Sequence, residues 1–259
     1  MYGRCSSSSP GSGSLLDRGG RGGVSFRVAS DGYVVECDDE ALRQSIARWT
    51  TLLDGETRDP TRLVVRTRGP GAPSIERPGA FVRHVDAVDE LMPALEAFLY
   101  RRMALPERGL AVLHASVLAR RNRAVLFMGP SGAGKSVLAL TLCNRGWTYL
   151  SDEFAPLDAQ GKVLAVPRPV CFDESEIEPD LLARISSGHT TWRTTIPTKS
   201  GPPRTMVHVL PGRAAPSGTA FDVAAVVELE PRAGAPPRMR RLNAPARRAL
   251  LFGALAASR

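Results

Sequence analysis

The sequence predicts an α/β protein in which a small N-terminal α+β domain precedes a larger domain built around a P-loop motif. Two observations lead to this prediction. Two apolar runs of strand length, Leu110–Leu118 and Ala124–Met128, come directly before a glycine-rich segment that a helical pattern follows. Short strand patterns and two amphipathic helix patterns fill residues 24–104. We therefore expect one domain over 24–104 and a second over 105–259.

The elements expected in the first domain follow from local patterns. They are two strands within Val24–Cys37 joined by a turn at Asp31-Gly32, a helix opening at Asp38-Asp39-Glu40, a strand over Leu63–Arg66, a loop over Arg68–Pro78 and a helix over Asp86–Met103. The first helix carries Leu42, Ile46 and Trp49 on one face, which predicts that this face is buried.

The elements expected in the second domain begin with its two apolar strands, which a polar turn at Arg120–Arg123 separates. They continue with a helix from Lys135 to about Arg145 ended by Gly146, strands over Thr148–Leu150, Lys162–Pro169, Met206–Leu210 and Phe221–Leu229, and a closing helix over Ala244–Ala257. The polar segment Ser186–Pro203 is rich in Thr, Gly and Pro and is expected to form a long mobile loop.

The composition suits a folded chain with anionic partners. Hydrophobic residues make up 43% of the 259 residues, and the net charge is +8. That charge favours nucleotides, acidic peptides, nucleic acid or an anionic membrane without choosing among them, and an arginine-rich composition explains it equally well. Residues 1–23 are rich in Ser and Gly and are expected to form a disordered tail.

The cysteine pattern and the hydropathy indicate which cellular compartment the sequence favours. The four cysteines contain no C-x-x-C pair, which argues against a zinc site or a disulfide framework. No apolar run has the length of a transmembrane helix, and the N-terminus lacks the apolar core of a secretory signal. We therefore expect a cytoplasmic protein with no membrane partner.

One segment matches the P-loop pattern G-x-x-x-x-G-K-[ST] in full. Its residues are Gly129, Pro130, Ser131, Gly132, Ala133, Gly134, Lys135 and Ser136. The glycines let backbone N–H groups turn inward toward phosphate oxygens, and the following helix adds its positive N-terminal dipole. Lys135 would neutralise the β- and γ-phosphate oxygens of a purine nucleoside triphosphate, and Ser136 would ligate Mg²⁺. A glycine-rich turn that matches by chance is the alternative.

An acidic pair, Asp152-Glu153, follows one helix and one strand after the P-loop. The spacing predicts that both carboxylates emerge beside the P-loop, where one would ligate Mg²⁺ and the other would accept a hydroxyl proton as a general base. Adjacent carboxylates raise one another's proton affinity, which favours this division of roles. A helix cap or a solvated turn after the strand is the alternative.

A third candidate, His114, lies within the apolar run that precedes the P-loop. A single histidine on a strand is usually a core residue with a hydrogen-bond partner. Spacing alone leaves both this alternative and a functional role open.

These motifs together resemble a known family. His114 in LHASVL, the P-loop GPSGAGKS, the RGW that ends its helix and the acidic pair in LSDEF resemble the C-terminal catalytic domain of HPr kinase/phosphorylase. They resemble still more closely the stand-alone HPr-kinase-related proteins, in which SDEF and a later PRPV-type strand occur. The similarity spans roughly residues 105–230. It implies the HPr-kinase/PEP-carboxykinase-like P-loop fold.

The resemblance also implies an activity, the transfer of the ATP γ-phosphate to a serine hydroxyl on a protein or peptide. Lys135 and Ser136 then carry over to the phosphates and Mg²⁺, and Asp152 carries over to the acid/base position. Glu153 takes the neighbouring metal-binding position, and His114 lies beside the phosphates.

The chain departs from this family at two places. The family's acidic pair is Asp-Asp, whereas this chain has Asp152-Glu153, and the family's Glu-Ile-Arg-Gly-type motif is here VPRP. Arg168 matches the arginine of that motif, but its metal-binding glutamate has no counterpart unless Glu174 or Glu176 substitutes for it. The departure argues against reverse phosphorolysis. The N-terminal region does not resemble the sensor domain of the bifunctional enzymes, which argues against regulation through HPr.

Related stand-alone kinases in peptide natural-product clusters phosphorylate a serine of a precursor peptide. By resemblance, the N-terminal domain could hold a leader peptide, for instance by strand addition. Basic residues could steer an acidic peptide, although a solvated surface is the favoured explanation of these charges. These residues are Arg193, Lys199, Arg204 and Arg213.

Other function classes stay open. A small-molecule kinase would need residues 170–204 to close a pocket above the phosphates. A nucleotide-gated binding protein would bind ATP and Mg²⁺ without phosphotransfer. Nucleic-acid binding is not favoured, because the C-terminal arginines lack interleaved aromatic residues and aromatics make up 6% of the chain. A homo-oligomer is possible, and no sequence pattern tests it.

Overall fold

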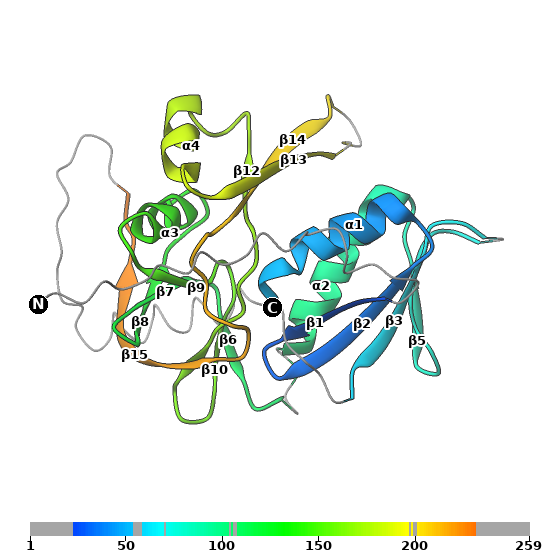
Figure 1. Ribbon diagram of the computed structural model, residues 1–259, viewed down its shortest axis with the longest axis horizontal. Coiled ribbons are helices and arrows are strands. Elements are labelled where there is room, and N and C mark those ends of the chain that lie inside the picture. The colour runs from blue at the N-terminus through cyan, green and yellow to red at the C-terminus, as the bar shows by residue number, and fades with distance from the viewer. Residues whose placement is uncertain are drawn as a thin grey trace, which may run out of the picture.

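The computed structural model describes residues 23–53, 59–69, 71–103, 105, 108–196, 198 and 201–231. Over these residues the chain is mixed α/β and forms two lobes, each built on its own sheet (Figure 1). All but the last residue of the expected tail, and the whole of the expected closing helix Ala244–Ala257, lie outside the described residues.

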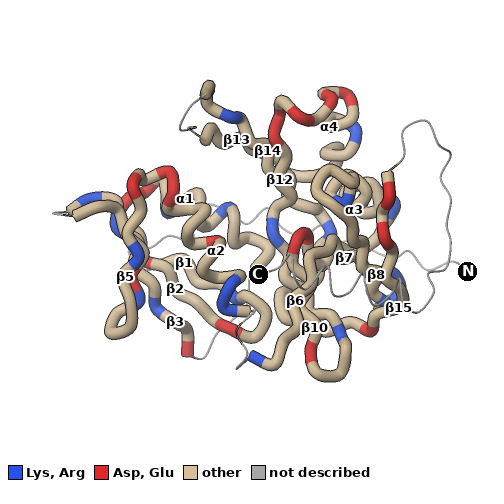
Figure 2. Tube along the Cα trace, turned by 180° about the vertical axis from the view of Figure 1, so that it is seen from behind, with Lys and Arg blue, Asp and Glu red and all other residues tan. Residues whose placement is uncertain are grey.

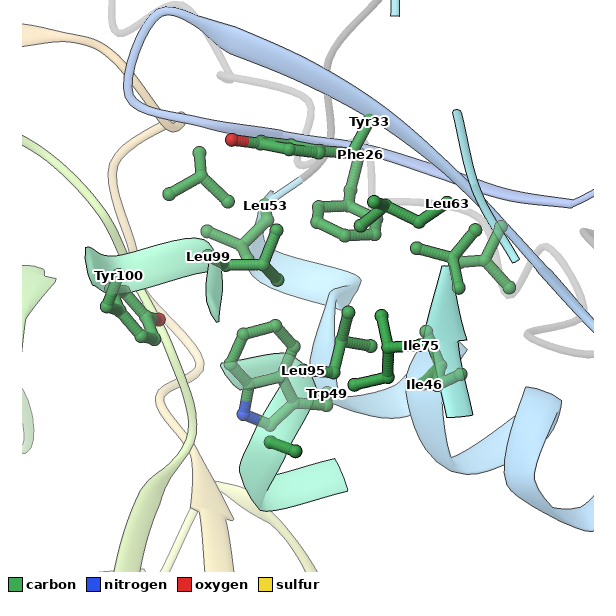
Figure 3. Close-up of a cluster of buried hydrophobic side chains, with 14 of the residues drawn as sticks. Phe26, Tyr33, Ile46, Trp49, Leu53, Leu63, Ile75, Leu95, Leu99 and Tyr100 are labelled. Atoms are coloured by element: carbon green, nitrogen blue, oxygen red, sulfur yellow. The ribbon is translucent and has the colours of Figure 1, made fainter. Parts of the chain in front are cut away.

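The N-terminal lobe is a five-stranded sheet of order β1-β2-β3-β4-β5. The strands are β1 (Val24–Val28), β2 (Asp31–Cys37), β3 (Thr61–Arg66), β4 (Ser74–Arg77) and β5 (Phe81–His84). The helices are α1 (Glu40–Trp49) and α2 (Leu91–Met103), with the short 3₁₀ turns η1 (Thr51–Leu53) and η2 (Val88–Glu90). Figure 1 shows both α-helices on the same face of the sheet. One hydrophobic cluster fills the space between that face and the helices (Figure 3).

The first helix begins where the sequence predicts. The Asp39 carboxylate accepts a hydrogen bond from the backbone N–H of Leu42 at 2.9 Å and so caps the helix N-terminus. Ile46 and Trp49 are buried against the sheet, and Leu42 packs at the margin of the same cluster. The predicted apolar face is confirmed.

Two predictions in this lobe need correction. The β1–β2 turn lies at Ala29-Ser30 and not at Asp31-Gly32, because the pairing of Phe26 with Tyr33 places two aromatic rings together in the core. The expected loop Arg68–Pro78 contains β4, whose Ile75 is fully buried and pairs with β3. The nearby glycine and proline residues favour a loop in the sequence pattern, whereas pairing with β3 stabilises a strand.

The second long helix starts later than expected. The α-helix begins at Leu91, after the 3₁₀ turn, and not at Asp86. Pro93 explains the shift, because proline lacks the N–H of a helix interior and is tolerated within the first turn.

The second lobe is a seven-stranded sheet of order β6-β10-β11-β15-β8-β7-β9. The strands are β6 (Ala111–Leu113), β7 (Ser116–Arg120), β8 (Arg123–Met128), β9 (Thr148–Ser151), β10 (Ala155–Leu157), β11 (Val163–Leu164) and β15 (Ala220–Glu228). Strand β8 pairs in parallel with β15 and antiparallel with β7, which in turn pairs with β9. The C-terminal ends of β8 and β9 and the N-terminal end of β7 therefore meet at one edge of the sheet.

Two further layers cover this sheet. Helix α3 (Lys135–Cys143) packs on β7 and β9, and helix α4 (Pro179–Ser186) packs on α3 (Figure 1). A three-stranded sheet follows with β12 (Val170–Asp173), β13 (Thr190–Ile196) and β14 (Arg204–Leu210) in the order β12-β14-β13.

The central hairpin agrees with the sequence. Arg121 and Asn122 both have positive φ, 51° and 62°, which is the geometry of a tight two-residue hairpin turn. Side chains of β8 alternate between two clusters, with Leu126 and Met128 in one and Phe127 in the other. The predicted polar turn and the apolar strand Ala124–Met128 after it are confirmed.

Three expected features of this lobe are wrong. The run Leu110–Leu118 is two strands, because Leu113 pairs with Ala155 while Ser116 pairs with Phe127 of a different strand. Of the expected strand Lys162–Pro169, only Val163–Leu164 forms a strand, although Ala165 and Val166 still donate backbone hydrogen bonds to Thr219 and Leu150. Pro167 and Pro169 then lack the N–H that a ladder needs.

The expected mobile loop Ser186–Pro203 contains β13, which pairs with β14 over its whole length. Its β-branched threonines favour a pleated strand, and the composition of the flanking residues concealed this preference. Residue 197 and residues 199–200 of this segment lie outside the described part of the chain.

The two lobes share buried contacts. Val112 and Val166 of the second lobe belong to the hydrophobic cluster of the first. The ring of Tyr100, at the edge of the cluster in Figure 3, stacks on the ring of Phe154 with centroids 4.1 Å apart. Helix α2 therefore packs directly against the turn that follows β9.

Candidate active site

The P-loop forms at the end of β8, where the sequence predicts it. Gly129, Gly132 and Gly134 have φ values of 152°, 76° and 84°, which side chains other than glycine rarely adopt. A Cβ at Gly129 would lie 2.8 Å from the carbonyl oxygen of Leu229, so β15 also requires glycine there. The loop leads straight into α3, whose first residue is Lys135. The predicted strand–loop–helix context is confirmed.

The lysine of this motif is nearly buried, with 8% of its surface exposed. Its ammonium group donates to the carbonyl oxygens of Gly129 at 2.9 Å and Pro130 at 3.0 Å. The N–H of Ala133 donates to the same Pro130 carbonyl at 3.2 Å and closes the turn of the loop. The charged group is thus held against the loop by weak neutral acceptors, which a phosphate would outcompete.

The first acidic residue lies beside the P-loop serine. The Ser136 hydroxyl donates to Oδ2 of Asp152 at 2.8 Å, and the Ser116 hydroxyl donates to Oδ1. Asp152 is buried, with 4% of its surface exposed. The start of β7, the start of α3 and the turn after β9 therefore bring these three side chains together. Sequence reasoning missed Ser116, because a serine two residues after His114 carries no signal of its own.

The second acidic residue has a different partner. Oε2 of Glu153 accepts a hydrogen bond from Nη1 of Arg168 at 2.8 Å, and its side chain is 49% exposed. Its φ of 72° lies in the left-handed region, which costs a non-glycine residue energy. The chain thus separates the roles of the two neighbouring carboxylates: Asp152 engages the P-loop serine and Glu153 engages an arginine.

Arg168, the partner of Glu153, lies at the junction of the two lobes. Its guanidinium carbon lies 5.7 Å from the ring centroid of Tyr100 and 6.0 Å from that of Phe154. Nη1 is also 2.8 Å from Oε1 of Glu96 on α2. Burial opposes the charge of Arg168, but Glu96 and the other anionic neighbours outweigh burial and hold its pKa above the ordinary value.

Sequence reasoning missed Glu96 as part of this site. A signal was present, because Glu96 is the one acidic residue within the apolar run of α2, LMPALEAFLYRRM. Burial raises the pKa of the Glu96 carboxyl, and Arg168 opposes that rise.

His114 lies at the break between β6 and β7 and is partly buried. Its neighbour Leu113 pairs with Ala155, and Ser116 bonds Asp152, so its backbone runs alongside the acidic turn. Its predicted place beside the phosphates stays a prediction.

Glu174 and Glu176, the two candidates to replace the family's metal-binding glutamate, follow β12 of the three-stranded sheet. Glu174 accepts from Arg193 at 2.7 Å, and Glu176 lies 3.5 Å from Arg204. Both arginines are exposed partners of acidic groups, and their role in steering a peptide stays a prediction. Lys199 lies outside the described residues.

The donor set fits a hard divalent cation that arrives with a nucleotide. A serine hydroxyl and a carboxylate are oxygen ligands, and Mg²⁺ usually keeps several waters and takes one or two protein carboxylates plus phosphates. Within the described residues, no cluster of three or more His, Cys, Asp and Glu side chains could hold a metal alone. Ser136 and Asp152 would supply the protein ligands in the present arrangement. Glu153 would have to leave Arg168 to join them.

Charge and hydropathy add two findings about partners. Figure 2 shows acidic and basic residues interspersed along the backbone of both lobes. None of the described helices combines the length and the apolar character that a membrane span requires.

No protein-family model matches this chain, and no match is found among curated proteins.

Proposed function

We propose that this chain is an ATP-dependent kinase that transfers the γ-phosphate to a serine hydroxyl of a peptide or protein. The observation that carries the proposal is the 2.8 Å hydrogen bond from Ser136 to Asp152, next to Lys135 at the N-terminus of α3. A P-loop serine next to a buried carboxylate is the pair of side chains that holds Mg²⁺ in P-loop nucleoside triphosphatases. We also propose the HPr-kinase/PEP-carboxykinase-like form of the P-loop fold, on the resemblance of the motifs.

The loop residues would bind and orient the triphosphate. The N–H groups of the loop and the dipole of α3 favour the phosphate oxygens. Lys135 would exchange its two backbone carbonyl partners for β- and γ-phosphate oxygens, which bear full charge. Mg²⁺, when bound through Ser136 and Asp152, would neutralise charge on the β- and γ-phosphates.

The acceptor step needs a base near the γ-phosphate. The serine oxygen of the acceptor forms a bond to the γ-phosphorus while the bond from that phosphorus to the β–γ bridging oxygen breaks, and ADP leaves. The hydroxyl proton passes to the Asp152 carboxylate, which Ser116 orients through its hydrogen bond to Oδ1. Positioning and charge neutralisation would supply most of the rate enhancement.

A nucleotide-gated binding protein is the second candidate. One observation favours it: Glu153 is bonded to Arg168 and not to the P-loop serine. A chain that never releases Glu153 would bind nucleotide with fewer metal ligands and would transfer phosphate poorly.

The test is transfer from γ-labelled ATP in the presence of Mg²⁺. The acceptors are peptides from the small open reading frames encoded beside the gene, together with a pool of small hydroxyl compounds, and Lys135→Ala is the control variant. Label on a serine of one peptide, absent with the control, would support the peptide kinase. Label on a small compound would indicate a small-molecule kinase. Binding of ATP without labelling of any acceptor would favour the nucleotide-gated protein.

A further inference from the structure

A polar cluster around the nearly buried Arg168 joins the N-terminal lobe to the acidic turn. Helix α2 contributes Glu96 and Tyr100, the turn after β9 contributes Glu153 and Phe154, and Arg168 lies among them. The Tyr100 and Phe154 rings are nearly parallel, with 6° between their planes, and the guanidinium lies near both. The side chain of Arg168 is only 11% exposed, so water screens its charge poorly.

The two carboxylates contact the same nitrogen in different ways. Both lie 2.8 Å from Nη1 of Arg168. The contact to Glu153 has the geometry of a hydrogen bond, whereas Oε1 of Glu96 is buried without a hydrogen-bond partner despite its ion-pair distance. Nε of Arg168 is likewise buried and unpaired. Glu153 is therefore the bonded partner, and Glu96 is a second carboxylate already within reach.

We propose that Arg168 is a positioning residue that holds Glu153 away from the metal in the nucleotide-free chain and exchanges it for Glu96 when Mg²⁺ and nucleotide bind. This inference rests on the proposed function, because it assigns the trigger to the Ser136–Asp152 site. Glu153 then becomes a ligand contributed on binding, and Glu96 of the N-terminal lobe makes its release possible.

Charge compensation is the physical reason for the exchange. A buried guanidinium left without a carboxylate is strongly unfavourable. Glu96 prevents that outcome, because it lies within ion-pair distance before Glu153 moves. Only a reorientation of the Arg168 N–H groups is needed to complete the hydrogen bond. The N-terminal lobe is thereby coupled to metal binding through one side chain of α2.

Glu96→Gln tests the exchange without removing a side chain. In the variant Arg168 has Glu153 as its sole carboxylate in the cluster, so release of Glu153 becomes unfavourable. We expect the affinity for a non-hydrolysable ATP analogue, measured by calorimetry, to fall about tenfold with Mg²⁺ and to stay unchanged with EDTA. The control is Glu90→Gln, in the turn before α2, where Glu90 accepts from the backbone of Asp86 and contacts no arginine of the cluster.

A double variant makes the test specific. In a Glu153→Gln background, Glu96→Gln should no longer change the Mg²⁺-dependent affinity, because no carboxylate remains to be released. An equal loss in both backgrounds would overturn the proposal. So would a loss that is the same with and without Mg²⁺.

A measurement without nucleotide separates this inference from the proposed function. Glu96→Gln should lower deuterium uptake of the segment 151–155 in the free protein, because Arg168 then binds Glu153 alone. A merely structural role for Glu96 would raise the uptake. Unchanged or raised uptake overturns the exchange, whereas lowered uptake in a chain that binds no nucleotide would support the tether and reject the proposed kinase.

Discussion

The two carboxylates of the acidic pair are adjacent in sequence, but they belong to differently built halves of the site. Asp152 bonds two hydroxyl groups, one at the start of β7 and one in the first turn of α3, next to the contiguous P-loop motif. Glu153 bonds Arg168, in a cluster assembled from three distant segments. A local motif thus specifies which chemistry is present, while tertiary contacts decide which group is available for it.

The two halves also differ in how fully their polar atoms are paired. Both oxygens of Asp152 accept a hydrogen bond. In the other half, the Tyr100 hydroxyl, Nε of Arg168 and Oε1 of Glu96 are buried without hydrogen-bond partners. A fully satisfied buried network is rigid, whereas unpaired buried groups are unfavourable and gain from any rearrangement that gives them partners. We infer that the P-loop half is preorganised and the Arg168 half is adjustable.

The largest expected effect would come from Asp152→Asn. Removing the charge should reduce phosphotransfer by about 10²–10⁴-fold, because the acceptor proton loses its base, while ATP binding through the loop persists. Glu153→Gln should reduce transfer by a smaller factor, since it removes one proposed metal ligand and leaves the proposed base in place. Transfer from labelled ATP measures the activity of each variant, and calorimetry measures its affinity for ATP. An Asp152→Asn variant that transfers at the wild-type rate would rule out this role.

The next effect concerns stability at the lobe junction. Tyr100→Ala should lower the free energy of unfolding by about 3–5 kcal/mol, because it removes a buried ring that stacks on Phe154. Tyr100→Phe should keep or raise stability, because the hydroxyl has no partner in its buried position. Denaturant unfolding of both variants measures the difference. A loss above about 1 kcal/mol in the Phe variant would mean that the hydroxyl is paired after all.

Much of the first half of the site could be predicted from sequence. The P-loop, the start of α3 and the approach of Asp152 to Ser136 follow from glycine positions and from one helix and one strand of intervening chain. Such features depend on neighbours within a few residues, and periodicity reports them well. The cap at Asp39 belongs to the same class.

The second half could not be predicted from sequence, because its members meet only through folding. The distance from Glu96 to Arg168 depends on how α2 packs against the second lobe, and no local pattern encodes that packing. The same reason explains the missed strands β4 and β13, whose partners β3 and β14 supply the pairing. A buried charge within an apolar helix was the available signal.

A smaller effect is expected from Ser116→Ala. The hydroxyl bonds a buried carboxylate across two strands, so its removal should lower the free energy of unfolding by about 1.5–3 kcal/mol. Ser45→Ala is the matched control, because the Ser45 hydroxyl bonds the backbone of its own exposed helix turn. Equal effects in thermal unfolding of the two variants would show that Asp152 does not depend on Ser116.

The smallest effect is expected at the helix cap of Asp39. It tests whether the loss of a local contact changes only the lobe that contains it. Asp39→Ala removes the carboxylate that bonds the N–H of Leu42 and should lower the free energy of unfolding by about 1 kcal/mol. Asp39→Asn should retain most of the stability, because an amide oxygen can cap the helix in the same way. Helix α1 contacts β1 and β2, whereas the acidic pair follows β9 in the second lobe. Hydrogen exchange should therefore rise in 39–43 and stay unchanged at 151–155. A rise in both segments would mean that coupling between the lobes is spread through the shared core and does not depend on Arg168 alone.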